Sequence, residues 1–76
     1  MSATKDLDRY ILADPEILGG EPVFRGTRVP VASLFEHLES GCSLDEFLGN
    51  FPSVSREMAV AVLAGAQELT LEKANR

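Results

Sequence analysis

The sequence is poor in the residues that build catalytic, metal-binding or cross-linked sites. It has one cysteine, one histidine and no tryptophan among its 76 residues. The single thiol, that of Cys42, excludes an intrachain disulfide, and His37 with Cys42 supplies too few ligands for a zinc site. No apolar stretch is long enough to span a bilayer, and the N-terminus lacks the apolar core of a signal peptide. We therefore expect a cytoplasmic protein that uses no metal or cofactor and contacts no membrane.

Basic charge is also scarce. The chain has 7 Lys and Arg against 12 Asp and Glu, so its formal net charge is −5. Non-specific binding to nucleic acid or to an anionic membrane needs a basic surface, and this balance argues against both. Residues 31–72 contain Arg56 as their only lysine or arginine. The C-terminal part of the chain is therefore predicted to be acidic and suited to a basic protein partner.

Glycine and proline are concentrated in one segment, residues 19–30, which reads GGEPVFRGTRVP. Glycine permits positive φ and proline fixes φ, so their alternation specifies one backbone path. Arg25 and Arg28 bracket a tight Gly26-Thr27 step and place two guanidinium groups beside a turn. The residues expected to shape the turns are Gly20, Pro22, Gly26 and Pro30. The segment is either a structural cover for the helices that follow or a recognition surface.

The N-terminal third of the chain predicts extended structure. Residues 1–8 are polar and charged and are expected to be flexible. Residues 9–12 form a short β-prone run, and the apolar pieces at 17–18 and 22–24 adjoin glycine. We expect two or three short extended segments, with a hairpin through the glycine pair that separates the last two pieces.

From Pro30 onward the apolar spacing becomes helical. The first helical pattern begins at Val31 and ends before Gly41, which suits the position just after a helix. Pro30 itself suits the first turn. A second helix begins after Ser43, which forms a capping box with Glu46, and it ends at an Asn-Phe-Pro sequence.

A third helix is predicted from the N-cap Ser55 through residue 69, with fraying towards Arg76. It is apolar nearly all round, which is typical of a helix buried on more than one side. One face comprises Met58, Ala61, Val62, Gly65 and Leu69. The other face comprises Val60, Leu63, Ala64 and Leu71. In so small a domain we expect this second face to meet another chain, either a partner or a second copy in a homo-oligomer.

Together these patterns predict a mainly α fold. It is a trihelical helix-turn-helix-like domain with an N-terminal extended segment or short β-hairpin. The domain is expected to cover residues 9–72, between a flexible N-terminus at 1–8 and a frayed C-terminus at 73–76. The second and third helices would form the helix-turn-helix pair.

Two blocks of the sequence resemble a known family. Residues 17–31, ILGGEPVFRGTRVPV, resemble the hallmark of the domain of unknown function 433 family. Residues 41–48 and 51–55 fit the second block of that family, although Phe24 stands where Ile or Val is usual. The resemblance implies a small helix-turn-helix protein similar to VapB-type antitoxins, which often accompany a PIN-like ribonuclease toxin. It therefore implies a protein that neutralises a toxin and represses its own operon.

Four side chains are candidates for contact with nucleic acid or with a partner: Arg25, Thr27, Arg28 and Arg56. The alternative for the first two arginines is structural, because guanidinium groups also pair with carboxylates and pin segments together. In that case the expected partners are Glu21, Glu36 and Glu39. The acidic balance of the helical part favours the structural role.

No catalytic constellation is present. His37 lies beside the apolar stripe of the first predicted helix and is expected to be solvated. Cys42 has no base at a motif spacing and is expected to be structural. Asp45 and Glu46 occupy the first turn of a helix, where carboxylates complement the helix dipole. We therefore expect a protein that is not an enzyme and has no small-molecule substrate.

Two functions stay open on these grounds. The first is a non-enzymatic antitoxin-like protein that binds and neutralises a PIN-like ribonuclease. The alternative is a homodimeric helix-turn-helix transcriptional regulator, or an interaction module of unknown function, with DNA contacts from Arg28 and Arg56. The two can coexist, because such antitoxins often repress their own operon.

Overall fold

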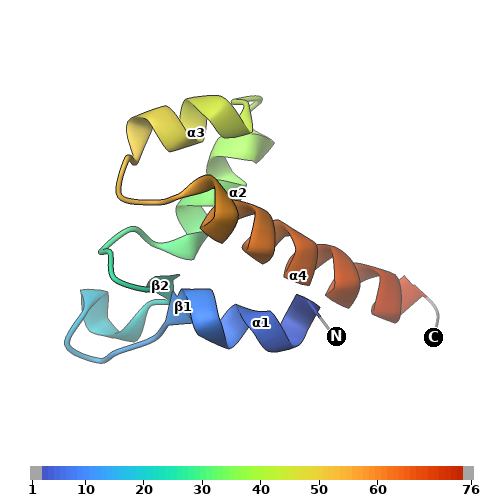
Figure 1. Ribbon diagram of the computed structural model, residues 1–76, viewed down its shortest axis with the longest axis horizontal. Coiled ribbons are helices and arrows are strands. Elements are labelled where there is room, and N and C mark those ends of the chain that lie inside the picture. Colours follow the sequence, from blue (N-terminus) through green and yellow to red (C-terminus); the bar gives the residue numbers. More distant parts are fainter. Residues whose placement is uncertain (1–2, 75–76) are drawn as a thin grey trace.

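The chain is mainly helical, with a small β-hairpin near its N-terminus (Figure 1). The computed structural model describes residues 3–74. In order, the elements are α1 (Ala3–Tyr10), β1 (Ile11–Leu12), the 3-10 turn η1 (Leu18–Gly20), β2 (Val23–Phe24), α2 (Val31–Glu39), α3 (Leu44–Asn50) and α4 (Arg56–Ala74). The predicted fold class is confirmed, since three helices follow a short hairpin, and α1 is an additional helix.

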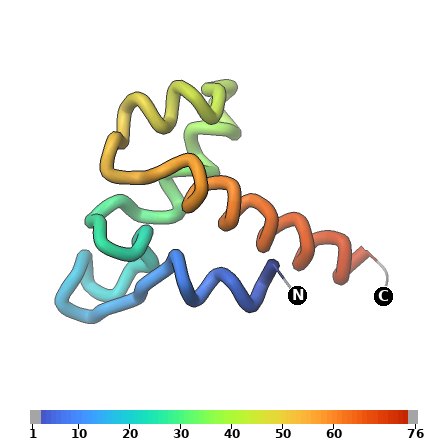
Figure 2. The backbone as a smooth tube through the Cα atoms, in the orientation of Figure 1, coloured from blue at the N-terminus to red at the C-terminus, as the bar shows by residue number. Residues whose placement is uncertain are grey.

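Helix α1 corrects the expectation of a flexible start. Residues 3–10 are helical, and Arg9 and Tyr10, expected to be extended, form its last turn. The helix runs against α4 in the opposite direction, as Figure 2 shows. The Glu68 carboxylate accepts the backbone N–H of Ala3 at 2.6 Å, and the Leu7 side chain lies against Gly65. The polar sequence of α1 did not predict a packed helix, because the residues that α1 contacts belong to a helix about sixty residues later in the chain.

A short β-hairpin is present, as predicted, but β2 pairs with residues 11–12 and not with the apolar piece at 17–18, which leads into the 3-10 turn η1. Ile11 lies opposite Phe24 and Leu12 opposite Val23 in antiparallel register, and a further bridge joins Val23 to Pro30. Two consecutive glycines at positive φ, at +66° and +93°, turn the chain between the strands. An L side chain is strained in this region, so glycine suits the path taken here.

Helix α2 begins one residue later than Pro30, which is its N-cap, and it ends as predicted. Gly41 has a φ of +92° and donates its N–H to the carbonyl of Leu38 at 3.1 Å. The N–H of Cys42 bonds to the carbonyl of His37 at 2.9 Å. These two bonds form a Schellman motif, which satisfies carbonyls at the end of the helix and reverses the chain.

The caps predicted for the last two helices are present. The hydroxyl of Ser43 accepts the N–H of Glu46 at 3.1 Å, and the Glu46 carboxylate accepts the N–H of Ser43 at 2.8 Å. At α4 the hydroxyl of Ser55 accepts the N–H of Met58 at 3.2 Å. Helix α4 continues to Ala74, so residues 73 and 74 are helical and not frayed, while 75 and 76 lie outside the described residues.

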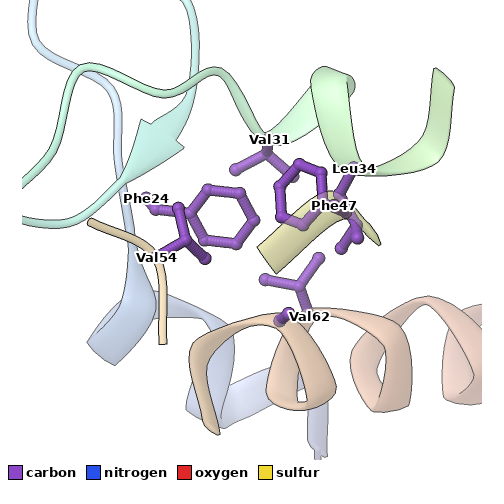
Figure 3. Close-up of a cluster of buried hydrophobic side chains, with 7 residues drawn as sticks. Phe24, Val31, Leu34, Phe47, Val54 and Val62 are labelled. Carbon is purple, nitrogen blue, oxygen red and sulfur yellow. The ribbon is translucent and has the colours of Figure 1, made fainter. Parts of the chain in front are cut away.

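The core lies where the hairpin meets the three later helices. Figure 3 shows side chains from β2, α2, α3, α4 and the turn before α4 pointing toward one another. The buried cluster consists of Phe24, Val31, Leu34, Phe47, Val54, Ala59 and Val62. Because β2 supplies one of its two phenylalanines, the glycine-rich segment is fixed to the helical body by its own apolar residues.

His37 is not solvated as expected. Its ring lies edge-on to Phe47 and Phe51, with centroid distances of 5.5 and 5.4 Å. Its Nδ1 lies 2.8 Å from the carbonyl oxygen of Ser33. An imidazole presents an apolar body and a polar edge, so it can border a core and still satisfy a ring nitrogen. The helical spacing alone did not show this, because the phenylalanines belong to the next helix and the turn after it.

Candidate partner-binding surface

The turn between β2 and α2 is held by its own polar groups. The N–H and hydroxyl of Thr27 both donate to the carbonyl of Phe24, at 2.9 and 2.7 Å. The same hydroxyl accepts the N–H of Val29 at 3.0 Å. Gly26 has a φ of +82° at the third position of this turn, where a type II turn requires glycine. The hydroxyl of Thr27 is therefore already used within the turn.

Arg25 fastens the turn to the preceding helix. One terminal nitrogen of its guanidinium donates to the carbonyls of Asp8, at 2.9 Å, and Ile11, at 3.1 Å. The Asp8 carbonyl lies in the last turn of α1, where a cation is favourable, and the Ile11 carbonyl lies in β1 directly after it. Within residues 3–74 the expected ion pairs with Glu21, Glu36 and Glu39 do not form. Arg25 therefore has the predicted structural role. Its acceptors are backbone carbonyl oxygens, which could not be predicted from the pattern of charged side chains.

Arg28 is the arginine that remains available at the turn. Its side chain is exposed, and within the described part of the chain it makes no hydrogen bond or ion pair. The structure therefore separates two residues that the sequence presented as a pair. Arg25 is occupied, while Arg28 can contact an anionic group without giving up an existing bond.

Arg56, the fourth candidate, pairs with Asp45. This ion pair joins the first turns of α3 and α4, and both side chains are largely exposed, at 61% and 76%. An exposed pair adds little stability. It does neutralise Arg56 locally, so the beginning of α4 carries less basic charge than the sequence suggests.

The helices α2, α3 and α4 present an acidic surface. Their exposed carboxylates are Glu36, Glu39, Asp45, Glu46, Glu57 and Glu72. Within residues 31–74 the lysines and arginines are Arg56, which is paired, and Lys73 in the last turn of α4. The charge pattern predicted from the sequence is therefore a feature of the molecular surface.

Helix α4 is buried on one side. Ala59, Val62 and Gly65 are buried, whereas Val60 and Leu71 on the opposite side are 48% and 55% exposed. Of the other residues predicted for this outward face, Leu63 and Ala64 are half-buried. Of the inward face, Met58 and Ala61 are half-buried, and Leu69 is 50% exposed. Leu69 belongs to the C-terminal half of α4, which extends past the hairpin and α2 (Figure 1).

Within residues 3–74, no three His, Cys, Asp or Glu side chains converge into a group that could hold a metal ion. None of the helices there has the length and apolar character needed to cross a membrane.

Comparison with known proteins places the chain in a family. A family profile described as "Protein of unknown function (DUF433)" matches residues 11–65. An uncharacterized protein, y4eO, of Sinorhizobium fredii (strain NBRC 101917 / NGR234) is 43% identical over 47 residues, which are 62% of this chain and 21% of that protein. The chain thus spans about a fifth of the length of this curated relative.

The fold has a counterpart among solved structures. The crystal structure of a DUF433 member from Anabaena variabilis ATCC 29413, at 2.00 Å resolution, superposes with a TM-score of 0.69. The two chains are 29% identical, and the match covers 95% of this chain and 70% of the other. The profile match includes the hairpin, the turn with both arginines, α2, α3 and the first half of α4. The chain therefore belongs to the DUF433 family.

Proposed function

We propose that the chain is a non-enzymatic, antitoxin-like protein that binds and neutralises a small PIN-like ribonuclease. The observation that carries this proposal is the acidic surface of α2, α3 and α4, where five exposed carboxylates remain besides Asp45, which pairs with Arg56. A ribonuclease must attract a polyanion, so its active-site face is basic. A folded acidic surface can occupy that face in place of the RNA.

Electrostatic complementarity also explains how such a complex would form. Oppositely charged surfaces raise the rate of association and exclude partners of the same sign. Charges on the rim of an interface act mainly on the association rate and on its salt dependence. The exposed Glu36 and Glu39 on α2 are suited to this role, since neither has a partner to lose within residues 3–74.

The test is recovery of the tagged chain from its native host after nuclease treatment, followed by identification of what remains bound. We expect one small basic PIN-like protein in stoichiometric amount, released as the salt concentration is raised. The double variant Glu36→Lys/Glu39→Lys is expected to recover less of it, while Arg28→Ala recovers the same amount. Recovery of the chain alone would overturn the proposal.

DNA binding is the second candidate, and Arg28 favours it. The order of α3, the turn at residues 51–55 and α4 is that of a helix-turn-helix pair. Arg28 is exposed and unpaired within the described residues, so it can contact a phosphate. In a selection from random duplexes at low salt, this candidate predicts enrichment of one sequence and lost affinity in Arg28→Ala and Arg56→Ala. Unchanged affinity in both variants would exclude this surface.

A further inference from the structure

The loop between β1 and β2 holds a leucine in a backbone conformation that suits glycine. Leu18 has a φ of +49°, and among residues 3–74 it is the one residue other than glycine with a positive φ. An L side chain is strained in this left-handed region. Gly19 and Gly20, which follow, also have positive φ, and glycine adopts it without strain. The sequence therefore places a leucine where glycine would follow the same path with less strain.

The fold itself gains little from this leucine. The Leu18 side chain is 47% exposed, and it is not among the apolar side chains that pack on the buried cluster. In Figure 1 the loop projects from the hairpin, away from the C-terminal end of α4. A single exposed leucine is ordinary on a protein surface, but strained residues concentrate at binding sites. An exposed and strained apolar side chain therefore points to a contact outside the chain.

Hydrogen bonds within the loop fix its shape. The N–H of Ile17 donates to the carbonyl of Asp14 at 2.8 Å, and the N–H of Gly20 donates to the carbonyl of Ile17 at 3.0 Å. The N–H of Glu21 donates to the carbonyl of Leu18 at 3.3 Å. A segment that is already ordered loses little conformational entropy when it binds. Leu18 is thus presented in a fixed position before any partner arrives.

The charge of the loop indicates what kind of surface fits it. Residues 13–24 contain Asp14, Glu16 and Glu21 but no lysine or arginine. The side chains of Glu16 and Glu21 are exposed, and within the described residues they make no hydrogen bond or ion pair. A leucine flanked by free carboxylates is complementary to an apolar pocket with a basic rim. A second copy of the chain is disfavoured, because two such loops bring like charges together.

We propose that Leu18 is the apolar anchor by which the chain holds a basic protein partner. The leucine fills an apolar pocket on the partner, and Glu16 and Glu21 face lysine or arginine side chains at the rim of that pocket. A few well-packed side chains carry most of the binding free energy of an interface, whereas rim charges act mainly on the association rate. The inference rests on the proposed function, because the partner is the basic protein proposed there.

Leu18→Asn separates binding from folding. Asparagine has nearly the shape of leucine, but it is polar and tolerates the left-handed region better. The Tm of the variant should equal or exceed that of the wild type. Its affinity for the basic protein recovered with the wild-type chain, measured by calorimetry, should fall by about tenfold or more. A lower Tm would make Leu18 a packing residue, and an unchanged affinity would place it outside the interface. Either result would overturn the proposal.

Leu69→Asn is the matched control. Leu69 is 50% exposed, as Leu18 nearly is, but it lies within α4 and has no backbone strain. The control variant should bind the basic protein as tightly as the wild type does. Equal losses of affinity in the two variants would show a general effect of exposed apolar surface and would overturn the assignment to the loop.

Two further measurements test the occupant of the loop. Glu16→Gln/Glu21→Gln should slow association with the basic protein at low salt and leave the Tm unchanged, whereas an unchanged rate would contradict a basic rim. Sedimentation equilibrium of the purified chain should give the same mass for the wild type and Leu18→Asn. A mass that rises with concentration in the wild type alone would show a second copy on the loop and overturn the proposal. The proposed function fails differently, since no basic protein is then recovered with the wild type.

Discussion

At the residue scale, the two arginines that flank Gly26 differ in what they hold. Arg25 donates to one carbonyl in the last turn of α1 and to another in β1, whereas the Arg28 side chain makes no hydrogen bond or ion pair within the described residues. Similar side chains three positions apart therefore have separate roles, one internal and one available to a partner.

This difference predicts unequal effects on stability. Arg25→Ala should lower the free energy of unfolding by about 1 kcal/mol, because hydrogen bonds from a charged donor are lost, although water partly replaces them at this exposed site. Arg28→Ala should change it by less than about 0.5 kcal/mol, as is usual for an exposed side chain without contacts. Urea denaturation of both variants measures the difference. Equal losses would contradict the assignment of Arg25 as the structural arginine.

At the element scale, the N-terminus of α3 depends on one reciprocal pair. Ser43→Ala removes the side-chain acceptor for the N–H of Glu46 and should cost about 1 kcal/mol. Two groups of Ser43 hold the pKa of Glu46 below its ordinary value. The backbone N–H contributes most, and the hydroxyl contributes less. In the variant, that pKa should rise towards the ordinary value, as an NMR titration of the carboxyl group would show. Because the backbone N–H remains as a donor in the variant, a pKa unchanged by the substitution would contradict the contribution of the Ser43 hydroxyl.

The sign of the pH dependence follows from the same pair. A carboxyl group whose pKa is lower in the folded chain than in the unfolded one stabilises the fold above the unfolded pKa. The contribution of Glu46 is therefore complete above its ordinary value of 4.5 and is lost as the pH falls below it. Glu46→Gln can keep the cap but cannot titrate, so its unfolding curve should change less between neutral and acidic pH. An identical pH dependence in wild type and variant would contradict this account.

The packing of α1 on α4 depends on a glycine. A Cβ on Gly65 would lie 2.6 Å from a Leu7 methyl carbon, and 2.8 Å from its Cγ, so Leu7 must move. Gly65→Ala gains about 1 kcal/mol of helix propensity but pushes α1 outward, and overpacking costs about 1–3 kcal/mol. We expect faster amide exchange in α1 with the core amides unchanged.

Gly49→Ala is the matched control for this experiment. Gly49 lies within α3, and nothing comes within 4 Å of the position that its Cβ would take. The substitution should stabilise the chain by about 0.5–1 kcal/mol and leave the exchange of α1 amides unchanged. If Gly65→Ala behaved in the same way, α1 would not be packed on α4 as described.

The helix ends and helix α1 differ in how far they could be predicted from the sequence. The capping box at Ser43, the end of α2 at Gly41 and the start of α4 at Ser55 depend on neighbours within a few residues, so local spacing predicted them. Helix α1 depends on Gly65 and Glu68, which are distant along the chain. The same limit applies to the candidate site, where the acceptors of Arg25 are carbonyls with no signature in the sequence.

At the scale of the whole molecule, the chain has an acidic exterior and a small core. Among residues 3–74, eight apolar side chains are buried, and they come from the hairpin, the three later helices and the turn before α4. The exposed carboxylates lie on α2, α3 and α4, and α4 also exposes the apolar side chains of Val60 and Leu71.

Titration of ribonuclease activity tests most directly the proposed neutralisation of a ribonuclease by the acidic surface. A PIN-like protein recovered with the chain would be assayed on RNA while purified chain is added at physiological salt. We predict that stoichiometric addition abolishes cleavage, and that Glu36→Lys/Glu39→Lys requires a large excess. Full ribonuclease activity in the presence of excess wild-type chain would contradict the account.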